Sequence, residues 1–345
     1  MAEYLITGGA GFFGSILKKY FLEKGAECVS IDLVHDDFKH ENFTAIQGDI
    51  CDEALMEKVF SEHKFAAVFH CAALLAHVKS DLKRLWHSNV DGTRVVCKMA
   101  EKYGVPKIIF ISSNCLWAKN FDEPVSEDEV PEPQEIYGKS KWKCEKILMA
   151  HKDKINSIIF RSPTIMDEGR LGLLAILFEF IDENRKLPMV GDGKNIYQFI
   201  YAKDMAKAFE LALAADYSDI FNIGSDDVKT FNEVYTYVIE HSGSKSRLLH
   251  FPKWPMILAM KICFWLHLSP LGPYQYKMIA SNFVFNTSKI KRKLGFKPTL
   301  KNEEMLLKAY EYYHQNREEI AARKNVSAHN SAAKMGIIRL LKWLM

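Results

Sequence analysis

The sequence predicts an α/β protein, with a doubly wound parallel sheet followed by a smaller, mixed C-terminal module. Three observations predict this class. Short β-rich runs alternate with helical patterns through the first half of the chain, as in parallel sheets with crossover helices. A glycine-rich loop joins the first expected strand to the first expected helix. The second half is less regular, which indicates a separate module.

The elements of the first half follow from apolar, β-branched runs for strands and from helical periodicity for helices. Strands are expected at residues 4–6, 27–32, 44–47, 66–70, 107–112 and 157–161. Helices are expected at residues 15–24, 52–63, 82–103 and 137–150. The first helix ends at Gly25, and an acidic, proline-bearing loop at residues 122–135 precedes the last one.

The elements of the second half are fewer and farther apart. Helices are expected at residues 175–184, 203–215, 230–241 and 303–319, and strands around Phe199 and at residues 220–223. An aromatic-rich stretch runs from Phe251 to Phe285. Residues 323–345 are polar and alanine-rich until the final segment, 334–345, which is amphipathic.

The composition excludes several classes of protein. The 345 residues include 46 Lys and Arg against 43 Asp and Glu, without the strongly basic surface typical of nucleic-acid binding. Seven scattered Cys without a CxxC pair argue against a disulfide scaffold or zinc ribbon and indicate a reducing compartment. The His residues lack metal-binding spacing, so no metal is predicted. With no signal-peptide pattern and no apolar stretch of about 20 residues, we expect a cytoplasmic protein.

The loop after the first strand predicts a phosphate-binding site. Its sequence, Thr7-Gly8-Gly9-Ala10-Gly11-Phe12-Phe13-Gly14, has glycines at positions 8, 11 and 14. This spacing permits a tight turn, close approach of backbone N–H groups to a pyrophosphate, and close packing of helix against strand. The helix N-terminus adds partial positive charge beneath the anion. The sequence therefore predicts a dinucleotide-binding loop.

Asp32, at the end of the second strand, predicts which dinucleotide binds. A carboxylate there accepts hydrogen bonds from both hydroxyls of an adenosine ribose and repels a 2′-phosphate. No Arg follows closely, although His35 and Lys39 are nearby. The expected cofactor is therefore NAD rather than NADP, with a solvated strand-end Asp as the alternative.

Tyr137 and Lys141 form a candidate proton-relay pair at the start of a helix. Positions i and i+4 share one helix face, so the two side chains point to the same place. A neighbouring ammonium stabilises a phenolate and is expected to lower the pKa of Tyr137 from its usual value of about 10. A phenol tuned in this way acts as a general acid or base near neutral pH.

In order along the chain, these motifs resemble those of the extended short-chain dehydrogenase/reductases, in the group called NAD-dependent epimerases/dehydratases. Further matching segments are Gly48-Asp49-Ile50, His70-Cys71-Ala72-Ala73, Asn89-Val90-Asp91-Gly92-Thr93, Arg161-Ser162-Pro163 and residues 289–298. The resemblance spans roughly residues 4–312 and implies a Rossmann-type fold with a substrate-capping module. It implies an NAD site made of Gly8, Gly11, Phe12, Phe13, Gly14, Asp32, Asp49, Ile50, Cys71, Ala72, Ala73, Asn89, Ser112, Tyr137, Lys141, Ser162 and Pro163.

The module boundaries follow from the pattern of elements. The NAD-binding domain is expected to comprise residues 1–165 with returning segments near residues 197–225. The substrate-binding module is expected at residues 166–196 and 226–322. A flexible tail with an amphipathic end is expected at residues 323–345.

The resemblance also implies the chemistry. Ser113 would be the catalytic hydroxyl, Tyr137 the acid/base and Lys141 its electrostatic partner. The reaction implied is hydride transfer between nicotinamide and the carbon of a secondary alcohol or ketone, with Tyr137 moving the proton of the oxygen. Sugar-nucleotide dehydratases typically carry Thr-Asp-Glu at this strand end. This chain has Ser113-Asn114-Cys115 and no carboxylate there, so dehydration is not expected.

Three functions stay open for such a protein. A dehydrogenase of an apolar or lipid-linked substrate is favoured, because the segment around Trp254 is rich in large apolar residues and the turn at 191–195 resembles the 3β-hydroxysteroid dehydrogenase-like branch. That segment can equally be core. Nucleotide-sugar 4-epimerisation is the first alternative, although Tyr197 stands where such enzymes commonly carry an arginine. A non-enzymatic NAD-sensing or interaction protein is the second alternative. Candidate substrate contacts are His77, Asn114, Tyr197, Trp254 and Tyr276.

Two further contacts are expected. Members of the family often dimerise through the two long helices here assigned to residues 82–103 and 137–150. This chain offers apolar positions for that contact at Val95, Val96, Met99, Ile147 and Leu148. Residues 334–345 place Lys and Arg against an apolar stripe, a pattern that binds a membrane interface or a partner subunit. We therefore expect a homodimer with peripheral membrane contact through the tail, a small-molecule substrate, and no nucleic-acid partner.

Overall fold

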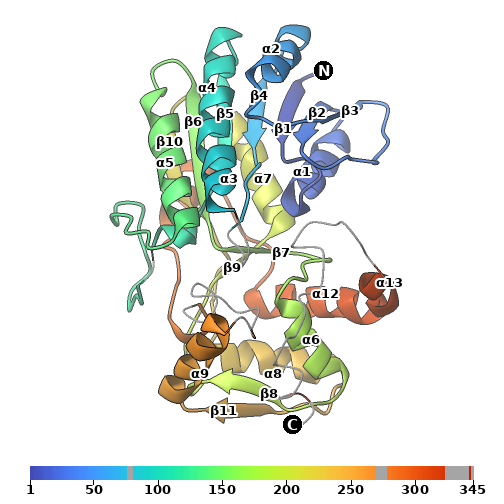
Figure 1. Cartoon of the computed structure of the whole chain (residues 1–345), viewed down its shortest axis with the longest axis vertical. Coiled ribbons are helices and arrows are strands. Elements are labelled where there is room, and N and C mark those ends of the chain that lie inside the picture. Colours follow the sequence, from blue (N-terminus) through green and yellow to red (C-terminus); the bar gives the residue numbers. More distant parts are fainter. Residues whose placement is uncertain (76–80, 118, 267, 269–277, 323–341, 343–345) are drawn as a thin grey trace.

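The computed structural model describes residues 1–75, 81–117, 119–266, 268, 278–322 and 342. Its larger part is a seven-stranded sheet in the order β10-β6-β5-β4-β1-β2-β3, with every neighbouring pair parallel (Figure 1). The strands are β1 (Glu3–Thr7), β2 (Glu27–Asp32), β3 (Phe43–Gln47), β4 (Ala67–His70), β5 (Lys107–Ser113), β6 (Asn156–Ser162) and β10 (Asp219–Asn222). The strands predicted for this sheet are confirmed to within one residue at each end.

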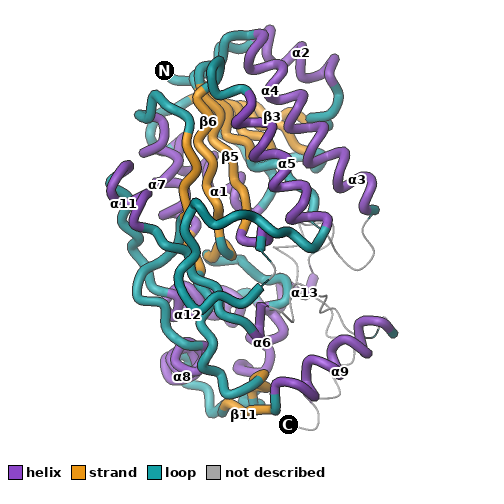
Figure 2. Tube along the Cα trace, turned by 90° about the vertical axis from the view of Figure 1, so that its left-hand side faces the viewer, coloured by secondary structure: helices purple, strands orange, loops and turns teal. Residues whose placement is uncertain are grey.

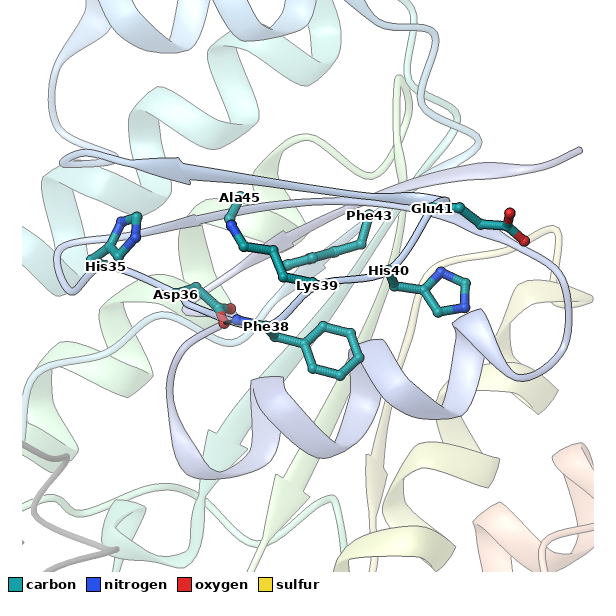
Figure 3. A pocket seen from close by; sticks show the side chains of 8 residues that line it. All are labelled: His35, Asp36, Phe38, Lys39, His40, Glu41, Phe43 and Ala45. Carbon is teal, nitrogen blue, oxygen red and sulfur yellow. Dashed lines mark hydrogen bonds between the residues drawn. The ribbon is translucent and has the colours of Figure 1, made fainter.

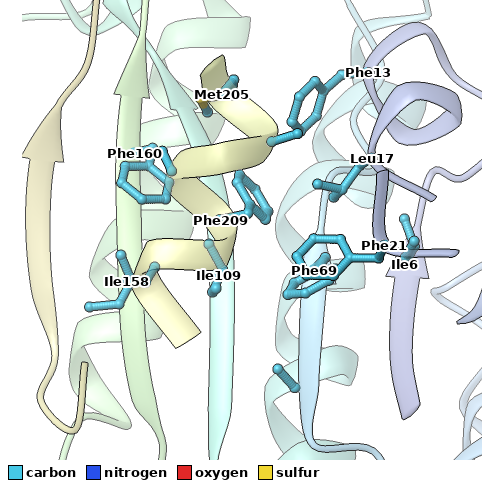
Figure 4. Close-up of a cluster of buried hydrophobic side chains, with 14 of the residues drawn as sticks. Ile6, Phe13, Leu17, Phe21, Phe69, Ile109, Ile158, Phe160, Met205 and Phe209 are labelled. Carbon is cyan, nitrogen blue, oxygen red and sulfur yellow. The ribbon is translucent and has the colours of Figure 1, made fainter. Parts of the chain in front are cut away.

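Helices cover both faces of the sheet. One face carries α1 (Phe12–Leu22), α7 (Ala202–Leu213) and α11 (Ser288–Leu294). The other face carries α2 (Glu53–Glu62), α4 (Gly92–Lys102) and α5 (Ile136–Ala150). On the first face, Phe21, Phe69, Phe160 and Phe209 belong to one buried cluster between sheet and helices (Figure 4). Burial on both faces explains why the central strands are apolar throughout rather than alternating.

The segment predicted as one helix over residues 82–103 is three consecutive pieces. These are α3 (Leu82–Trp86), a π-helical turn η1 (His87–Asp91) and α4. A π turn is rare and is frequently found at functional sites. Here it holds Ser88, Asn89 and Val90 in the interior. The apolar periodicity of the segment does not reveal this turn, because the flanking helices keep their own regular pattern on either side.

The smaller module lies beyond the ends to which the parallel strands point (Figure 1). Its helices are α6 (Leu174–Asp182), α8 (Phe231–His241), α12 (Asn302–Gln315) and α13 (Arg317–Ala322). Two parallel strand pairs accompany them, β7 (Thr164–Met166) with β9 (Phe199–Tyr201) and β8 (Leu187–Val190) with β11 (Leu248–Phe251). The helices expected in the second half are found, except that the terminal one is interrupted at Asn316. The predicted module boundaries stay a prediction.

The apolar segment around Trp254 forms α9 (Lys253–Trp265). None of its 13 residues is buried, and Trp254 and Trp265 are 74% and 77% exposed. The alternative that this segment is core is therefore wrong. Figure 2 shows α9 extending away from β11 at the edge of the smaller module. Among the residues that the structure describes, no helix combines the length and the apolarity needed to cross a bilayer.

The apolar positions expected to form a dimer contact are used inside the chain. Val95, Val96, Met99, Ile147 and Leu148 are at most 9% exposed and belong to the core beneath α4 and α5. Their assignment to a dimer surface is therefore wrong, because a residue buried in its own subunit has no surface left for a partner. The homodimer itself stays a prediction.

The predicted membrane-contact segment, residues 334–345, lies outside the described residues except for Lys342. The ammonium of Lys342 lies 2.5 Å from a carboxylate oxygen of Glu179 and 2.9 Å from one of Glu183. This one residue of the tail therefore contacts the end of α6. Membrane contact through the tail stays a prediction.

Candidate active site

The glycine loop lies where the strand order reverses. β1 has β2 on one side and β4 on the other, so the carboxyl ends of β1 and β4 border the crevice in which such sheets bind ligands. Gly8 follows β1 with a positive φ of 75°, and a Cβ there would lie 2.8 Å from the Cα of Ala72, just after β4. Only glycine fits this turn without strain.

The first helix packs directly on this loop. α1 begins at Phe12 with Gly11 as its N-cap. A Cβ at Gly14 would stand 2.1 Å from the carbonyl oxygen of Gly8, so no side chain can separate helix from loop. The first turn of a helix, here containing Phe12 and Phe13, presents N–H groups and partial positive charge to an anion. This cradle fits the pyrophosphate of NAD.

Asp32 holds the loop from the end of β2. Its two carboxylate oxygens accept the backbone N–H groups of Ala10 and Val34, each at 3.0 Å. A carboxylate has about four lone-pair positions, so it keeps the capacity to accept ribose hydroxyls. The ring of His35 lies 3.2 Å from Asp37 rather than against Asp32. The arrangement therefore fits an adenosine ribose better than a 2′-phosphate.

Asp49 and Ile50 lie in the turn after β3, where the resemblance places contacts with the cofactor. Oδ1 of Asp49 accepts the backbone N–H of Cys51 at 2.9 Å. Ile50 is buried, and a Cβ at Gly92 would come within 2.6 Å of its Cδ1. Asp49 is thus oriented by its own turn, and Ile50 is packed against the first residue of α4.

A chain of hydrogen bonds behind the loop joins β1, β4 and α4. Oγ1 of Thr7 lies 2.7 Å from Nδ1 of His70, whose Nε2 lies 2.9 Å from Oγ1 of Thr93. Thr93 in turn donates to the carbonyl oxygen of Asn89 at 2.6 Å. Burial lowers the pKa of His70 to about 3, so the ring is neutral. Thr7 therefore donates to Nδ1 and Nε2 donates to Thr93. Sequence analysis did not foresee this network.

Asn89, in the π turn, holds the segment that follows β4. Its side chain accepts the N–H of Leu74 at 2.8 Å and donates to the carbonyl oxygen of the same residue at 3.1 Å. Its amide also donates to Oγ of Ser140 on α5 at 3.0 Å. Residues 71–73, which the resemblance places in the NAD site, lie in the segment that Asn89 holds. The π turn thus ties three elements together at the strand edge.

Ser113, Tyr137 and Lys141 come together at the carboxyl end of β5. Ser113 is the last residue of that strand, and the other two lie one turn apart on α5. The hydroxyl of Ser113 acts on the phenol of Tyr137 and lowers its pKa against the effect of burial. The ammonium of Lys141 lies 6.0 Å from the centre of the Tyr137 ring and donates to the carbonyl oxygen of Ile111 at 2.8 Å. The backbone of β5 therefore fixes the ammonium near the phenol.

The electrostatics of this trio differ from the expectation. Burial raises the pKa of Tyr137, two neighbouring thiols add to the rise, and the charge of Arg170 opposes it. Burial also lowers the pKa of Lys141. The prediction that Lys141 brings the pKa of the phenol below its usual value is therefore wrong for this structure. Loss of solvation is the largest effect on both groups, because burial disfavours their charged forms.

Arg170 is a site residue that sequence analysis missed. It lies in the turn after β7, and its guanidinium carbon is 5.4 Å from the centre of the Phe12 ring. Its charge also reaches Tyr137, whose pKa it lowers against the effect of burial. Arg170 is therefore close to both the glycine loop and the phenol. No local motif marks it, because only the folding of β7 back over the sheet end brings it there.

Three further predicted NAD contacts lie at the same strand edge. Ser162, the last residue of β6, is the register partner of Ser113. Its hydroxyl donates to the carbonyl oxygen of Pro163 at 2.8 Å. The hydroxyl of Ser112 is buried and has no hydrogen-bond partner among the described residues. These residues therefore lie near Ser113, Tyr137 and Lys141, and their contact with NAD stays a prediction.

The predicted substrate contacts do not form one group. Asn114 donates its amide to the phenol oxygen of Tyr197 at 2.6 Å, and both side chains are buried. This bond joins the end of β5 to the smaller module. Trp254 lies on the exposed side of α9, and the structure does not bring it to this pair. His77 and Tyr276 lie outside the described residues.

A hollow of about 450 Å³ lies along the loop between β2 and β3 (Figure 3). It is lined by His35, Asp36, Phe38, Lys39, His40, Glu41, Phe43 and Ala45. Asp36 is paired with Lys18 of α1, so the buried charges there satisfy each other. None of the catalytic candidates lines this hollow, which is therefore not where we place the chemistry.

Comparison with known proteins gives the family. Residues 4–224 match the model of the NAD dependent epimerase/dehydratase family. The uncharacterized protein y4nG of Sinorhizobium fredii is 31% identical, over 99% of this chain and 86% of its own. The dTDP-D-glucose 4,6-dehydratase of Mus musculus is 27% identical, over 90% of this chain and 88% of its own. The structure of UDP-glucose 4-epimerase from Thermotoga maritima with UDP-glucose has a TM-score of 0.75 and 26% identity, covering 91% of this chain and 99% of its own.

These similarities confirm the fold that the sequence predicted and the family that its motifs resemble. They also confirm that the protein is an enzyme and that its cofactor is NAD, since both are part of what defines the family. The alternative of a non-enzymatic NAD sensor is not supported. The chain therefore belongs to the NAD-dependent epimerase/dehydratase family of extended short-chain dehydrogenase/reductases.

Proposed function

We propose that this protein is a nucleotide-sugar 4-epimerase, which oxidises one secondary carbinol carbon of the sugar and then reduces it from the other face. The observation that supports this best is the convergence of Ser113, Tyr137 and Lys141 at the end of β5. The names of two similar proteins, the dTDP-D-glucose 4,6-dehydratase and the UDP-glucose 4-epimerase, specify nucleotide sugars. The preference for an apolar substrate has also lost its main support, because α9 is exposed.

The side chains divide the work among them. NAD, when bound, supplies the hydride acceptor and donor. Tyr137 takes the proton of the substrate hydroxyl as the carbonyl forms and returns it when the carbonyl is reduced. Ser113, whose hydroxyl acts on the same phenol, orients the same substrate oxygen. Lys141, held by the carbonyl oxygen of Ile111, favours the phenolate through its charge. The glycine loop and Asp32 position the dinucleotide.

Elimination of water is not part of the proposal. A dehydratase needs a positioned acid to protonate the leaving hydroxyl. The residue after Ser113 is Asn114, whose amide is committed to Tyr197 at 2.6 Å, and Cys115 follows it. An amide cannot supply that proton, so the sugar is expected to keep its oxygen.

The second candidate function is that of a dehydrogenase, which oxidises a secondary alcohol with net reduction of NAD. It is favoured by Tyr197, which stands where nucleotide-sugar epimerases commonly carry an arginine and is only 2% exposed. This position offers no cation to a diphosphate. If the protein is an epimerase, we expect the guanidinium of Arg170 to bind the diphosphate instead, since Arg170 lies near Phe12 and Tyr137.

One assay separates the two candidates. The protein is incubated with NAD and UDP-glucose or dTDP-glucose, the sugars are separated by chromatography, and the NADH absorbance is followed. An epimerase converts the sugar without accumulating NADH. A dehydrogenase accumulates NADH in step with oxidation of a secondary alcohol such as a hydroxysteroid. In either case Tyr137→Phe is expected to slow turnover about 10²-fold or more while NAD still binds. Turnover unaffected by this change contradicts both candidates.

A further inference from the structure

α9 presents an apolar stripe that remains exposed among the residues that the structure describes. Trp254, Leu258, Ile262 and Trp265 recur at intervals of three or four residues, so they lie along one side of the helix. Their exposed fractions are 74, 42, 49 and 77%. The opposite side is only partly exposed and rests on the module near β8. Two Trp and two aliphatic side chains in one exposed row mark an interaction surface rather than scattered surface residues.

The surroundings of this stripe carry positive charge. From residue 242 to residue 302 the sequence contains no Asp or Glu. Four exposed cations lie in α9 or shortly before it, and none is paired with a carboxylate in the described part of the chain: Lys245, Arg247, Lys253 and Lys261. On the loop that touches Lys253, Asp192 faces Lys194 at 3.9 Å. An anionic surface therefore complements this region.

We propose that α9 is a membrane-docking helix that lies in the interface of an anionic lipid surface. Its 13 residues rise about 20 Å, too little to span a bilayer, so the helix must lie along the surface. Trp254 and Trp265 are three helical turns apart on the same side. A helix parallel to the surface puts both rings at the depth of the headgroups, which Trp side chains favour. Lys261, which lies next to the stripe on the helix surface, then faces lipid phosphates.

A second copy of this chain fits the stripe less well. A symmetric contact places the same patch of both subunits face to face. The cations of α9 would then meet their own counterparts, and this segment supplies no carboxylate to separate them. A lipid surface satisfies the apolar row and the cations together. Because α9 extends away from the body of the molecule, such a surface can reach it without covering the sheet (Figure 2).

Vesicle flotation of the full chain tests this inference, and its result does not depend on the proposed function. We expect the protein to float with phosphatidylcholine vesicles that contain about one third phosphatidylserine, and not with phosphatidylcholine alone. The binding is expected to weaken as salt is raised, because the lipid charge is screened. Binding to neither vesicle overturns the inference.

Variants of α9 test whether this helix makes the contact. Ile262→Ser with Trp265→Ser, and separately Lys261→Glu, are each expected to weaken vesicle binding about tenfold. NAD binding is expected to stay unchanged in both, which shows that the chain is folded. A matched control changes an exposed apolar residue and an unpaired lysine of the larger part, Val130→Ser with Lys152→Glu, and is expected to bind as the unaltered protein does.

Two outcomes of these variants contradict the inference. If both α9 variants bind vesicles as well as the unaltered protein, another segment, such as residues 334–345, makes the contact. If sedimentation shows self-association that Ile262→Ser with Trp265→Ser abolishes, while no vesicle binds, the stripe is an interface between copies of the chain.

Discussion

In the proposed mechanism, proton transfer depends on two residues, Tyr137 and Lys141, whose pKa values burial moves toward each other. Burial raises the pKa of the Tyr137 phenol and lowers the pKa of the Lys141 ammonium. A phenol with a raised pKa stays protonated at neutral pH, which suits the half-reaction in which a carbonyl is reduced. The oxidative half-reaction needs the phenolate, so its rate is expected to increase with pH. In the same mechanism, the ammonium of Lys141 is expected to lower the pH that this half-reaction needs.

The first prediction removes the ammonium. Lys141→Met is expected to slow the oxidative half-reaction about 10²-fold and to move the rising part of its pH profile to higher pH, because the phenolate loses a neighbouring positive charge. The measurement is single-turnover reduction of NAD across the pH range. Lys139→Met, an exposed lysine of the same helix, is the control. An unchanged pH profile in Lys141→Met contradicts the electrostatic role.

The second prediction concerns the stability that His70 confers. Its pKa is about 3 in the folded protein and about 6.5 in an unfolded chain. Between these values only the unfolded state takes up the proton, so this contribution to stability is complete above about pH 6.5 and declines as the pH falls, by at most about 1.4 kcal/mol per pH unit. His70→Gln, which cannot titrate, is expected to show a flatter slope of unfolding free energy between about pH 7 and 5 in urea titrations. Equal slopes contradict this assignment.

The third prediction concerns the choice of dinucleotide. Asp32→Ala removes the carboxylate expected to accept ribose hydroxyls and to repel a 2′-phosphate. NAD is expected to bind about tenfold more weakly, and the preference for NAD over NADP to narrow. The ratio of the two dissociation constants is the decisive measurement, because general damage to the loop weakens both. Asp37→Ala, with a 92% exposed side chain in the same loop, is the control and should leave the ratio unchanged.

At the scale of elements, the close packing of α1 against the glycine loop after β1 leaves almost no space for side chains at the glycines. A Cβ at Gly14 would be 2.1 Å from the carbonyl oxygen of Gly8, whereas one at Gly11 would be 3.1 Å from the same atom. Gly14→Ala must therefore move the helix or the loop, at a cost of about 1–3 kcal/mol. It is expected to lower the unfolding temperature and weaken NAD binding far more than Gly11→Ala. Equal effects in calorimetry and NAD titration contradict the close packing described.

The elements that could be predicted are those whose cause is local. The strands follow from runs of apolar residues, and the glycine loop follows from the spacing of its glycines. Both signals span only a few residues of the sequence. The π turn around Asn89 could not be predicted, because it is stabilised by contacts with Leu74 and with Ser140 on α5. The exposure of α9 could not be predicted either, since its apolar composition is the same as that of a core helix.

At the scale of the whole molecule, the candidate site is assembled from segments that only the strand order brings together. Tyr137 and Lys141 were predictable as a pair because one helical turn joins them. The network from Thr7 through His70 to Thr93 was not, because it connects β1, β4 and α4. The position of Arg170 near Phe12 could not be predicted either, because it depends on the fold of the second half of the chain. Local sequence therefore predicts the reactive groups, and the topology determines what surrounds them.

Asn302, at the start of α12, anchors the residue through which the smaller module reaches the site, and its side chain is 1% exposed. It accepts the N–H of Phe199 at 3.0 Å and the hydroxyl of Ser225 at 2.8 Å, and it donates to the carbonyl oxygen of Tyr197 at 2.6 Å. Tyr197 in turn holds Asn114 beside the trio. The amide at the start of α12 is thus connected through two bonds to the end of β5.

Replacing this amide is expected to affect stability and catalysis together. Asn302→Ala removes three hydrogen bonds from the interior, and each loss costs about 1–3 kcal/mol, so the free energy of unfolding should fall by several kcal/mol. Because Tyr197 then loses its anchor, KM should rise more than kcat falls, since the catalytic trio is on the other module. Urea unfolding and steady-state kinetics measure the two effects. Asn316→Ala, which removes one bond at the end of the same helix, is the control. A large loss of stability with unchanged KM means that Asn302 supports the fold without positioning the site.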